Sequence, residues 1–249
     1  MMKIWNKVDQ VPTLQKNEVH IWRVFLETWS ADDIERGLNM LSSEEKARAD
    51  RFLQAKHRKR FITSHTTLHA ILTKYVLELW IPLRFRYNEY GKPYLVDNSA
   101  LQFNLSHSHS IALYAVAWDQ EVGIDIEYMR KDIHIDKIAE RFFSMEESTD
   151  LRKLPAEEQL AEFYRLWTLK EAYVKVTGRG LSFLLNKFTT NVRFIKTDGL
   201  ISSERRCEQA KSKSWNLCSI PVGEDYKAGL AVGKLIKIVH YFDWVTSRA

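Results

Sequence analysis

One group of residues able to do chemistry lies in the segment FYRLWTLKEAYVKVTGRGL, residues 163–181. The segment is predicted to form one helix that ends at a glycine-flanked turn, because glycine favours the left-handed conformation that stops a helix. Trp167, Glu171 and Lys175 are four residues apart, so they share one face of this helix. A glutamate followed by a lysine at this spacing is also a common solvated pair, and the helix alone leaves both interpretations open.

A second acidic group, in VGIDIE at residues 122–127, favours the chemical interpretation. Asp125 and Glu127 are two residues apart, which places both carboxylates on one face of a strand. On an edge strand both would face water, whereas their burial would be costly without a cation. Together with Glu171 they supply three hard oxygen ligands, which suit Mg²⁺ or Mn²⁺ better than zinc. Lys175 would add a second positive charge beside a metal-bound phosphate.

Further residues with the chemistry of a phosphate site lie upstream. Basic residues are dense in the segment 46–60, which predicts a solvated helical face or, for two or three of them, a phosphate clamp. The SHSHS segment, residues 106–110, is predicted to be a turn between strands. There Ser106 and His107 would hydrogen-bond a phosphate. Lys92, in the turn that follows Gly91, would reach the same place or remain in solvent.

Along the chain, the elements expected to position these groups follow one order twice: helices and then strands. Helix starts are expected at Ser30 and at Ser42, with Asp33 in the capping-box position of the first. The order predicts an α+β fold with two halves, residues 1–118 and 119–249, of which the second carries the metal and catalytic acids. The expected segments are a strand at 18–25, helices to 80, strands at 83–127, helices at 135–177 and strands at 188–242.

The composition narrows the class of protein. The chain has 249 residues, of which 45% are hydrophobic and 28% charged, as is typical of a soluble globular protein. A net charge of +5 suits an anionic ligand or an acidic protein partner. No continuous basic surface with interleaved aromatic residues is predicted, so nucleic acid is not an expected partner. The chain lacks a membrane-spanning apolar run, a signal peptide and a disulfide framework, so we expect no membrane partner and a cytoplasmic location.

Five motifs in one order resemble those of the 4′-phosphopantetheinyl transferase superfamily, in particular its monomeric, surfactin-type branch. They are GKPYL, FNLSHS, VGIDIE, RFFSMEE and LWTLKEAYVKVTGRGL, within a similarity that runs from about Leu41 to Leu185. The resemblance implies two similar α+β halves packed as a pseudo-dimer, with coenzyme A in the cleft between them. It also implies transfer of the 4′-phosphopantetheine arm of coenzyme A to a serine of an apo acyl or peptidyl carrier protein. The products would be the holo carrier and 3′,5′-ADP, a holo-[acyl-carrier-protein] synthase activity.

The resemblance also implies roles for single residues. Asp125, Glu127 and Glu171 match the metal ligands, and Glu171 also matches the base proposed for the carrier serine. Lys175 matches a catalytic lysine that faces the phosphates. Glu147, in the motif RFFSMEE, has no defined role. The coenzyme A contacts would be Arg48, Arg60, Lys92, Ser106, His107 and Lys175.

Two positions depart from the pattern of the family. Arg48 stands where a lysine often binds the 3′-phosphate, and Glu45 stands where a second basic residue can occur. These departures put the helical side of the phosphate clamp in question, and Lys46 is a candidate substitute.

Two other classes of protein remain open from the sequence. A Mg²⁺-dependent hydrolase of coenzyme A or nucleotide pyrophosphates would keep the acids without needing FNLSHS or GKPY. A non-catalytic nucleotide-binding module would not need Glu171. Because a chain with two halves should complete its own site, a monomer is expected.

Overall fold

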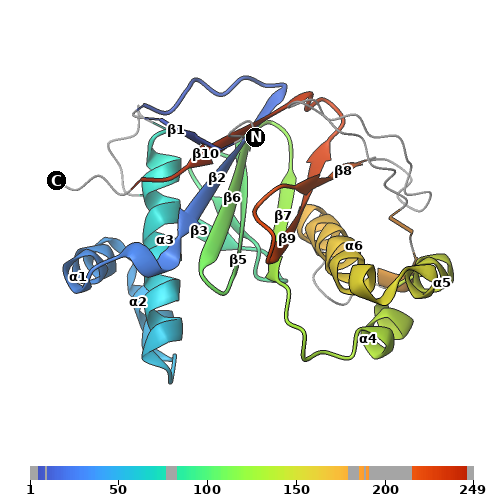
Figure 1. Cartoon of the computed structure of the whole chain (residues 1–249). Coiled ribbons are helices and arrows are strands. Elements are labelled where there is room, and N and C mark those ends of the chain that lie inside the picture. The colour runs from blue at the N-terminus through green and yellow to red at the C-terminus, as the bar shows by residue number, and fades with distance from the viewer. Residues whose placement is uncertain are drawn as a thin grey trace.

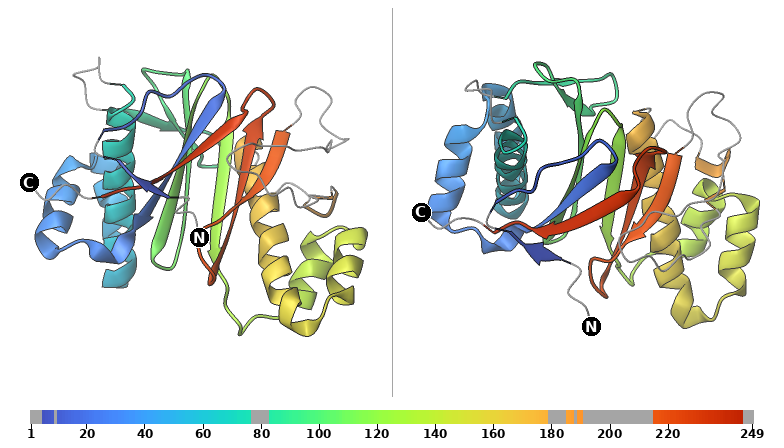
Figure 2. Two further views of the ribbon diagram at one scale, coloured as in Figure 1. Left: turned by 45° about the horizontal axis from the view of Figure 1, so that its top comes forward. Right: turned by 90° about the horizontal axis from the view of Figure 1, so that it is seen from above.

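The structure is a computed structural model, and it describes residues 5–8, 10–76, 83–178, 185–187, 189–190 and 215–245 (Figure 1). Helices and strands are mixed, and the α+β class predicted from the sequence is confirmed. Two sheets form the centre of the molecule, and each carries helices on its outer side (Figure 2). None of the helices in these residue ranges is long and apolar enough to cross a membrane.

The larger sheet has five strands and includes residues from both ends of the chain. In sheet order the strands are β1 (Asn6–Lys7), β10 (Ile238–Asp243), β2 (Glu18–Phe25), β6 (Ile111–Trp118) and β5 (Leu101–Ser108). Strands β2, β6 and β5 are antiparallel neighbours, whereas β10 pairs in parallel with β2 on one side and β1 on the other. The last strand of the C-terminal half therefore lies inside the sheet of the N-terminal half.

Helices of the first half lie beside this sheet. The long helix α3 (Ala55–Thr73) packs against it, with α1 (Ala31–Met40) and α2 (Ser43–Asp50) farther out (Figure 1). The predicted starts at Ser30 and Ser42 are confirmed, because each serine accepts a hydrogen bond from the third helical residue in a capping box. A short helix η1 (Leu26–Thr28) and the hairpin of β3 (Phe85–Tyr87) with β4 (Pro93–Leu95) complete this half.

The smaller sheet has three antiparallel strands and one long helix against it. The strands, in sheet order, are β7 (Val122–Tyr128), β9 (Tyr226–Gly233) and β8 (Trp215–Ile220). Helix α6 (Ala156–Thr177) packs on this sheet and ends at Gly178, which adopts the predicted left-handed conformation. The shorter elements of this half are α4 (Ile135–Phe142), α5 (Met145–Lys153) and η2 (Leu185–Lys187).

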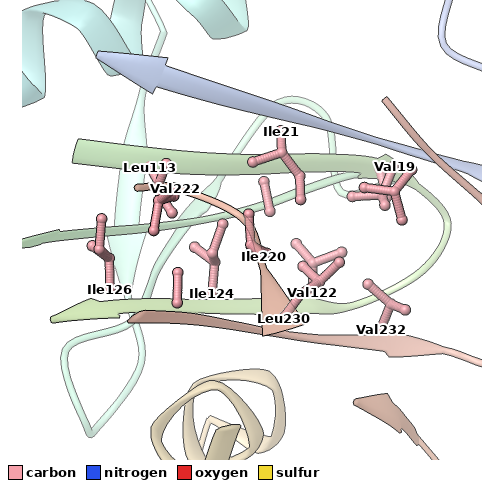
Figure 3. Packing of buried hydrophobic residues seen from close by; sticks show 14 of the residues in the cluster. Val19, Ile21, Leu113, Val122, Ile124, Ile126, Ile220, Val222, Leu230 and Val232 are labelled. Atoms are coloured by element: carbon pink, nitrogen blue, oxygen red, sulfur yellow. The ribbon is translucent and has the colours of Figure 1, made fainter. Parts of the chain in front are cut away.

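The apolar core lies on both faces of the larger sheet. On one face, side chains of β2 and β6 meet those of β7, β8 and β9; Ile21, Leu113 and Ile124 are fully buried there (Figure 3). On the other face, Trp22 and Tyr114 pack with residues of α3. Strand β6, IALYAVAW, is buried on both faces, which accounts for its nearly continuous apolar sequence.

Helix α6 approaches its sheet unusually closely because two strand residues lack side chains. A Cβ atom at Gly123 would lie 2.1 Å from the carbonyl oxygen of Ala172, and one at Gly229 would lie 2.5 Å from that of Thr168. Both distances are far below van der Waals contact, so only glycine permits this packing. The backbone of α6 thus rests directly on β7 and β9, next to the acids of β7.

Some sequence predictions are wrong in detail. The SHSHS segment was expected to be a turn, but β5 continues through Ser108, and the turn follows at His109, whose φ of 51° is left-handed. Helix α3 ends at Thr73 rather than near residue 80. Residues 77–82 lie outside the described ranges, as does most of the strand predicted at 188–195. The proposed division of the chain at residues 118 and 119 stays a prediction.

Candidate active site

The junction between the two sheets carries the acids of the DIE motif. Strand β5 runs beside β7, and two of its serines donate hydrogen bonds across the junction. Ser106 Oγ donates to Asp125 Oδ1 at 2.9 Å, and Ser108 Oγ donates to Glu127 Oε2 at 2.8 Å. The two serines are two residues apart on β5, and the two acids are two residues apart on β7. Each set therefore lies on one face of its strand, and the two faces meet at the junction. Both carboxylates are therefore fixed by side chains of the other half of the molecule.

Lys175 completes a three-residue contact with this junction. Its Nζ donates to Asp125 Oδ1 at 2.7 Å and to Ser106 Oγ at 2.8 Å. Asp125 is 4% exposed, and the ammonium group and the Ser106 hydroxyl both satisfy the same oxygen. The helix and the strand that were predicted to act together are thus in direct contact.

The acids form a cluster whose negative charge is not fully compensated. Burial, together with the charge of Asp125, raises the pKa of Glu171 to about 7. The same two causes raise the pKa of Glu127. Asp125 Oδ2 and Glu171 Oε1 are buried and accept no hydrogen bond within the described part of the chain. Unpaired buried carboxylate oxygens of this kind fit a hard divalent cation such as Mg²⁺ or Mn²⁺.

The oxygens of the three acids do not all lie close enough together to surround one ion. Among the residues that the structure describes, the oxygens of Asp125, Glu127 and Glu171 are not all within 4.8 Å of one another. Mg²⁺ commonly takes only one or two carboxylates and completes its shell with water and substrate phosphates. An open arrangement therefore fits such an ion, and the assignment of all three acids as ligands stays a prediction.

A pocket of about 480 Å³ opens beside Glu171 and Lys175. Four of the predicted coenzyme A contacts line it, and aromatic rings cover its other walls. Arg48 lies over the ring of Phe61, with 5.4 Å between the guanidinium carbon and the ring centroid. The cationic and imidazole residues of the lining are Arg48, His65, Lys92, His107 and Lys175, and the aromatic ones include Phe52, Phe61, Tyr87 and Tyr90. A pocket with this lining suits an anion that carries an aromatic group, such as a nucleotide.

Two of these residues have altered proton affinities. Lys92 donates to the carbonyl oxygen of Val122 at 3.2 Å, and burial lowers its pKa to about 8. Loss of solvent contact lowers the pKa of His107, and the charges of Lys175 and two nearby arginines, Arg60 and Arg48, lower it further. An anion in the pocket would offset this concentration of positive charge.

A second pocket, of about 390 Å³, meets the junction at Ser108 and Glu127. It is lined by Arg60 and Glu127 together with apolar and aromatic residues of α4 and α6, including Trp167. Arg60 also forms an ion pair with Glu27, with 2.7 Å between Nη2 and Oε1. The structure thus divides the predicted residues: Arg60 and Glu127 face this pocket, whereas Ser106 and Asp125 are buried and line neither pocket. A direct contact of Arg60 or Ser106 with coenzyme A stays a prediction.

Glu147, whose role the sequence left undefined, lies in a buried ion pair. Its side chain caps α5 by accepting from the backbone N–H of Ser144 at 2.9 Å. The backbone N–H and the hydroxyl of Thr190 also donate to it, each at 2.6 Å. Lys170, which is fully buried, lies 2.8 Å from Glu147 Oε2 and donates to the carbonyl oxygen of Leu185. These contacts tie α5, Leu185 and Thr190 to α6, the helix that carries Glu171.

The acidic residue at position 45 also has a structural explanation. Glu45 is buried, caps α2 through the backbone N–H of Ser42, and lies 3.1 Å from His69 Nε2. It faces α3 rather than the pocket lining, so it does not oppose the phosphate-binding residues there. Arg48, one turn later on the same helix, does line the pocket.

Comparison with known proteins places the chain in a family. Residues 27–119 match the model described as 4′-phosphopantetheinyl transferase, N-terminal, and residues 121–231 match that of the 4′-phosphopantetheinyl transferase superfamily. The 4′-phosphopantetheinyl transferase HetI of Nostoc is 42% identical over 175 residues, which cover 69% of this chain and 73% of HetI. The 4′-phosphopantetheinyl transferase Sfp of Bacillus subtilis is 33% identical over 175 residues, which cover 70% of this chain and 75% of Sfp. The chain belongs to the 4′-phosphopantetheinyl transferase superfamily and, within it, to the Sfp-like branch.

Proposed function

We propose that the protein transfers the 4′-phosphopantetheine arm of coenzyme A to a serine of an apo acyl or peptidyl carrier protein. Membership of the superfamily supports this reaction, and the relatives are named as transferases of this kind. The observation that carries the proposal is the contact of Asp125, Ser106 and Lys175, next to Glu171, at the end of a pocket lined by cationic and aromatic side chains. The hydrolase considered from the sequence finds no support among the named relatives.

Coenzyme A binds in this proposal with its nucleotide in the pocket of about 480 Å³. The aromatic walls suit the adenine ring, while Arg48, Lys92 and His107 suit the phosphates. The pyrophosphate then lies toward Lys175 and the acids at the sheet junction. The mild excess of positive charge on the chain also suits an acidic carrier protein.

In the transfer, the serine oxygen attacks the phosphorus that bears pantetheine, and the bond from that phosphorus to the bridging pyrophosphate oxygen breaks. Glu171 takes the serine proton directly or through water, and 3′,5′-ADP leaves with the bonding electrons. Asp125, Glu127 and Glu171 would hold Mg²⁺ or Mn²⁺, which when bound neutralises charge on the pyrophosphate. Lys175 contributes a further positive charge at the leaving group. A monomeric state and a cytoplasmic location stay predictions of the sequence.

The test is intact-mass spectrometry of a panel of apo carrier proteins incubated with the enzyme, coenzyme A and Mg²⁺. The expected result is a mass gain of one phosphopantetheine arm on at least one carrier, abolished by EDTA and restored by added Mg²⁺. Coenzyme A consumption is followed in the same samples. Consumption without any change in carrier mass would instead identify a hydrolase.

The resemblance to the family implies that His107, which lines the pocket, lies near the 3′-phosphate of coenzyme A, and this predicts a selective effect on binding. His107→Ala is expected to weaken binding of coenzyme A about tenfold, the effect of losing one charge-assisted hydrogen bond, and to leave dephospho-coenzyme A binding nearly unchanged. Isothermal titration calorimetry with both ligands measures the difference. His109→Ala serves as the control, because His109 follows on the same hairpin but lines the other pocket. An equal loss for both ligands would argue against a contact with the 3′-phosphate.

The raised pKa of Glu171 predicts a pH-dependent stability of the metal-free protein. The group releases its proton at about pH 7 when folded but near its ordinary value of 4.5 when unfolded. Between these values the folded state binds more protons, so the free energy of unfolding falls as pH rises through this window. Thermal unfolding in EDTA, measured across this pH range, should show that stability falls more steeply with rising pH for the wild type than for Glu171→Gln. Parallel curves for the two proteins would contradict the prediction.

A further inference from the structure

A second group of potential metal ligands lies far from the acids of β7, where the two ends of the chain meet. Glu18 and His20 are two residues apart on β2, so their side chains share one face of the larger sheet. His240 is the register partner of His20 on the parallel strand β10. Strand β6 separates β2 from β5 and the active-site junction. Within the described ranges, this is the one trio of histidine, cysteine or acidic residues whose ligand atoms all lie within 4.8 Å of one another.

The contacts of Glu18 with the two histidines, one through each carboxylate oxygen, are too long for hydrogen bonds and close to the spacing of ligands around an ion. Glu18 Oε1 lies 3.5 Å from His240 Nε2, and Glu18 Oε2 lies 3.8 Å from His20 Nε2. An N–H···O hydrogen bond spans about 2.7–3.2 Å. Ligands held tetrahedrally at zinc distances of about 2.0–2.2 Å are roughly 3.3–3.6 Å apart. A small inward movement of side chains would therefore complete such a shell.

His20 is held in the orientation that a metal ligand needs. Its Nδ1 lies 2.8 Å from the Tyr75 hydroxyl oxygen, which also accepts a hydrogen bond from the Trp22 indole at 2.8 Å. Its Nε2 points toward Glu18 and has no hydrogen-bond partner in the described chain, although the residue is only 1% exposed. Both ring tautomers of His20 fit this contact, and the one that carries its proton on Nδ1 presents the Nε2 lone pair, as in the usual second-shell arrangement of zinc-bound imidazole.

The trio is open to solvent on one side. The His240 side chain is 40% exposed and that of Glu18 is 15% exposed, so an ion can enter without unfolding of the sheet. A backbone N–H from Gln15 donates to Glu18 Oε2 at 3.2 Å and fixes the carboxylate.

We propose that Glu18, His20 and His240 form a zinc site that joins β10 to β2. Two imidazoles and one carboxylate, with water in the fourth position, are a ligand set that zinc favours. Imidazole-rich sites of this kind discriminate against Mg²⁺, which prefers oxygen ligands. The ion would fasten the last strand to the sheet of the first half, and it would stabilise the folded state because the unfolded chain holds no such site.

Cobalt and zinc binding to untagged, chelator-stripped protein tests this site. Titration with Co²⁺ should give the visible absorption of a tetrahedral nitrogen-containing site, and dialysis against Zn²⁺ should leave one ion per chain by elemental analysis. Zn²⁺ should also raise the unfolding midpoint. His240→Ala should weaken Zn²⁺ binding more than about 100-fold and abolish both the Co²⁺ absorption and the thermal shift.

Three further variants separate this site from other sources of binding. Glu18→Gln provides a second test with a conservative change, since His20 is too buried for its loss to be read without an effect on folding. His134→Ala, which removes an exposed histidine elsewhere, should bind Zn²⁺ as the wild type does. Asp125→Asn should retain the Zn²⁺ stoichiometry, because the site does not use the active-site acids. Binding that survives both His240→Ala and Glu18→Gln, or no binding by the wild type, would overturn the proposal.

Discussion

Replacement of Glu171 by glutamine is expected to lower kcat for carrier modification about 10²–10⁴-fold, the contribution of a positioned general base. Glutamine keeps the size of the side chain but can neither accept the serine proton nor supply a full negative charge to a metal. Binding of coenzyme A should change little, because the nucleotide pocket is formed mainly by other side chains. Rates are measured by the appearance of holo carrier under saturating coenzyme A, and binding by calorimetry.

The control for this variant is Glu158→Gln, an exposed glutamate in the first turn of the same helix α6. It should modify carriers at close to the wild-type rate, since loss of a surface charge near a helix start changes stability by only about 0.3–1 kcal/mol. A Glu171→Gln protein with more than a tenth of wild-type kcat would remove Glu171 from the role of base. A parallel loss of coenzyme A binding would point to a structural role instead.

The buried ion pair of Lys170 and Glu147 predicts the largest effect on stability. Lys170→Met should lower the free energy of unfolding by about 3–5 kcal/mol, because it leaves the Glu147 carboxylate buried without its cation. Such a loss is a large fraction of the about 5–15 kcal/mol by which folded proteins are stable. Urea denaturation followed by tryptophan fluorescence measures it.

Lys153→Met is the matched control, because Lys153 pairs with Asp150 at the surface with both side chains well exposed. An exposed pair contributes at most about 1 kcal/mol, so this variant should unfold close to the wild type. A double-mutant cycle with Glu147→Gln then isolates the interaction of the buried pair. A coupling energy near zero would mean that the hydrogen bonds from Ser144 and Thr190 are sufficient to hold Glu147.

The sequence predicted well the features that depend on neighbouring residues. Alternation marked the strand at 18–25, and the serine and aspartate of the first capping box marked the start of α1. The turn predicted at 106–110 is confined to His109 and Ser110; the prediction was too long because serine favours turns when judged locally. In the structure Ser106 and Ser108 meet acids of another strand, so their polarity reflects a partner that lies elsewhere in the chain.

The same limit applies to the site. The four-residue spacing predicted that Glu171 and Lys175 share one face of their helix. The two-residue spacing predicted that the acids of β7 share one face of their strand. No local pattern revealed that Lys170, next to Glu171, points away to Glu147, or that Glu18 and His20 meet His240. Interactions between distant segments carry no periodic signal, and only the assembled sheets reveal them.

Strand β10 has a consequence for how the protein is made. It pairs with β2 across about 220 positions of the chain, as the Arg23–Asp243 hydrogen bond illustrates. At translation rates of about 5–20 residues per second, β2 emerges roughly 10–45 seconds before its parallel partner. During that interval EVHIWRVF is an exposed, largely apolar edge, the kind that recruits other nascent chains. Yield in cells should therefore depend on translation speed and on chaperones that shield this edge until residue 243 is synthesised.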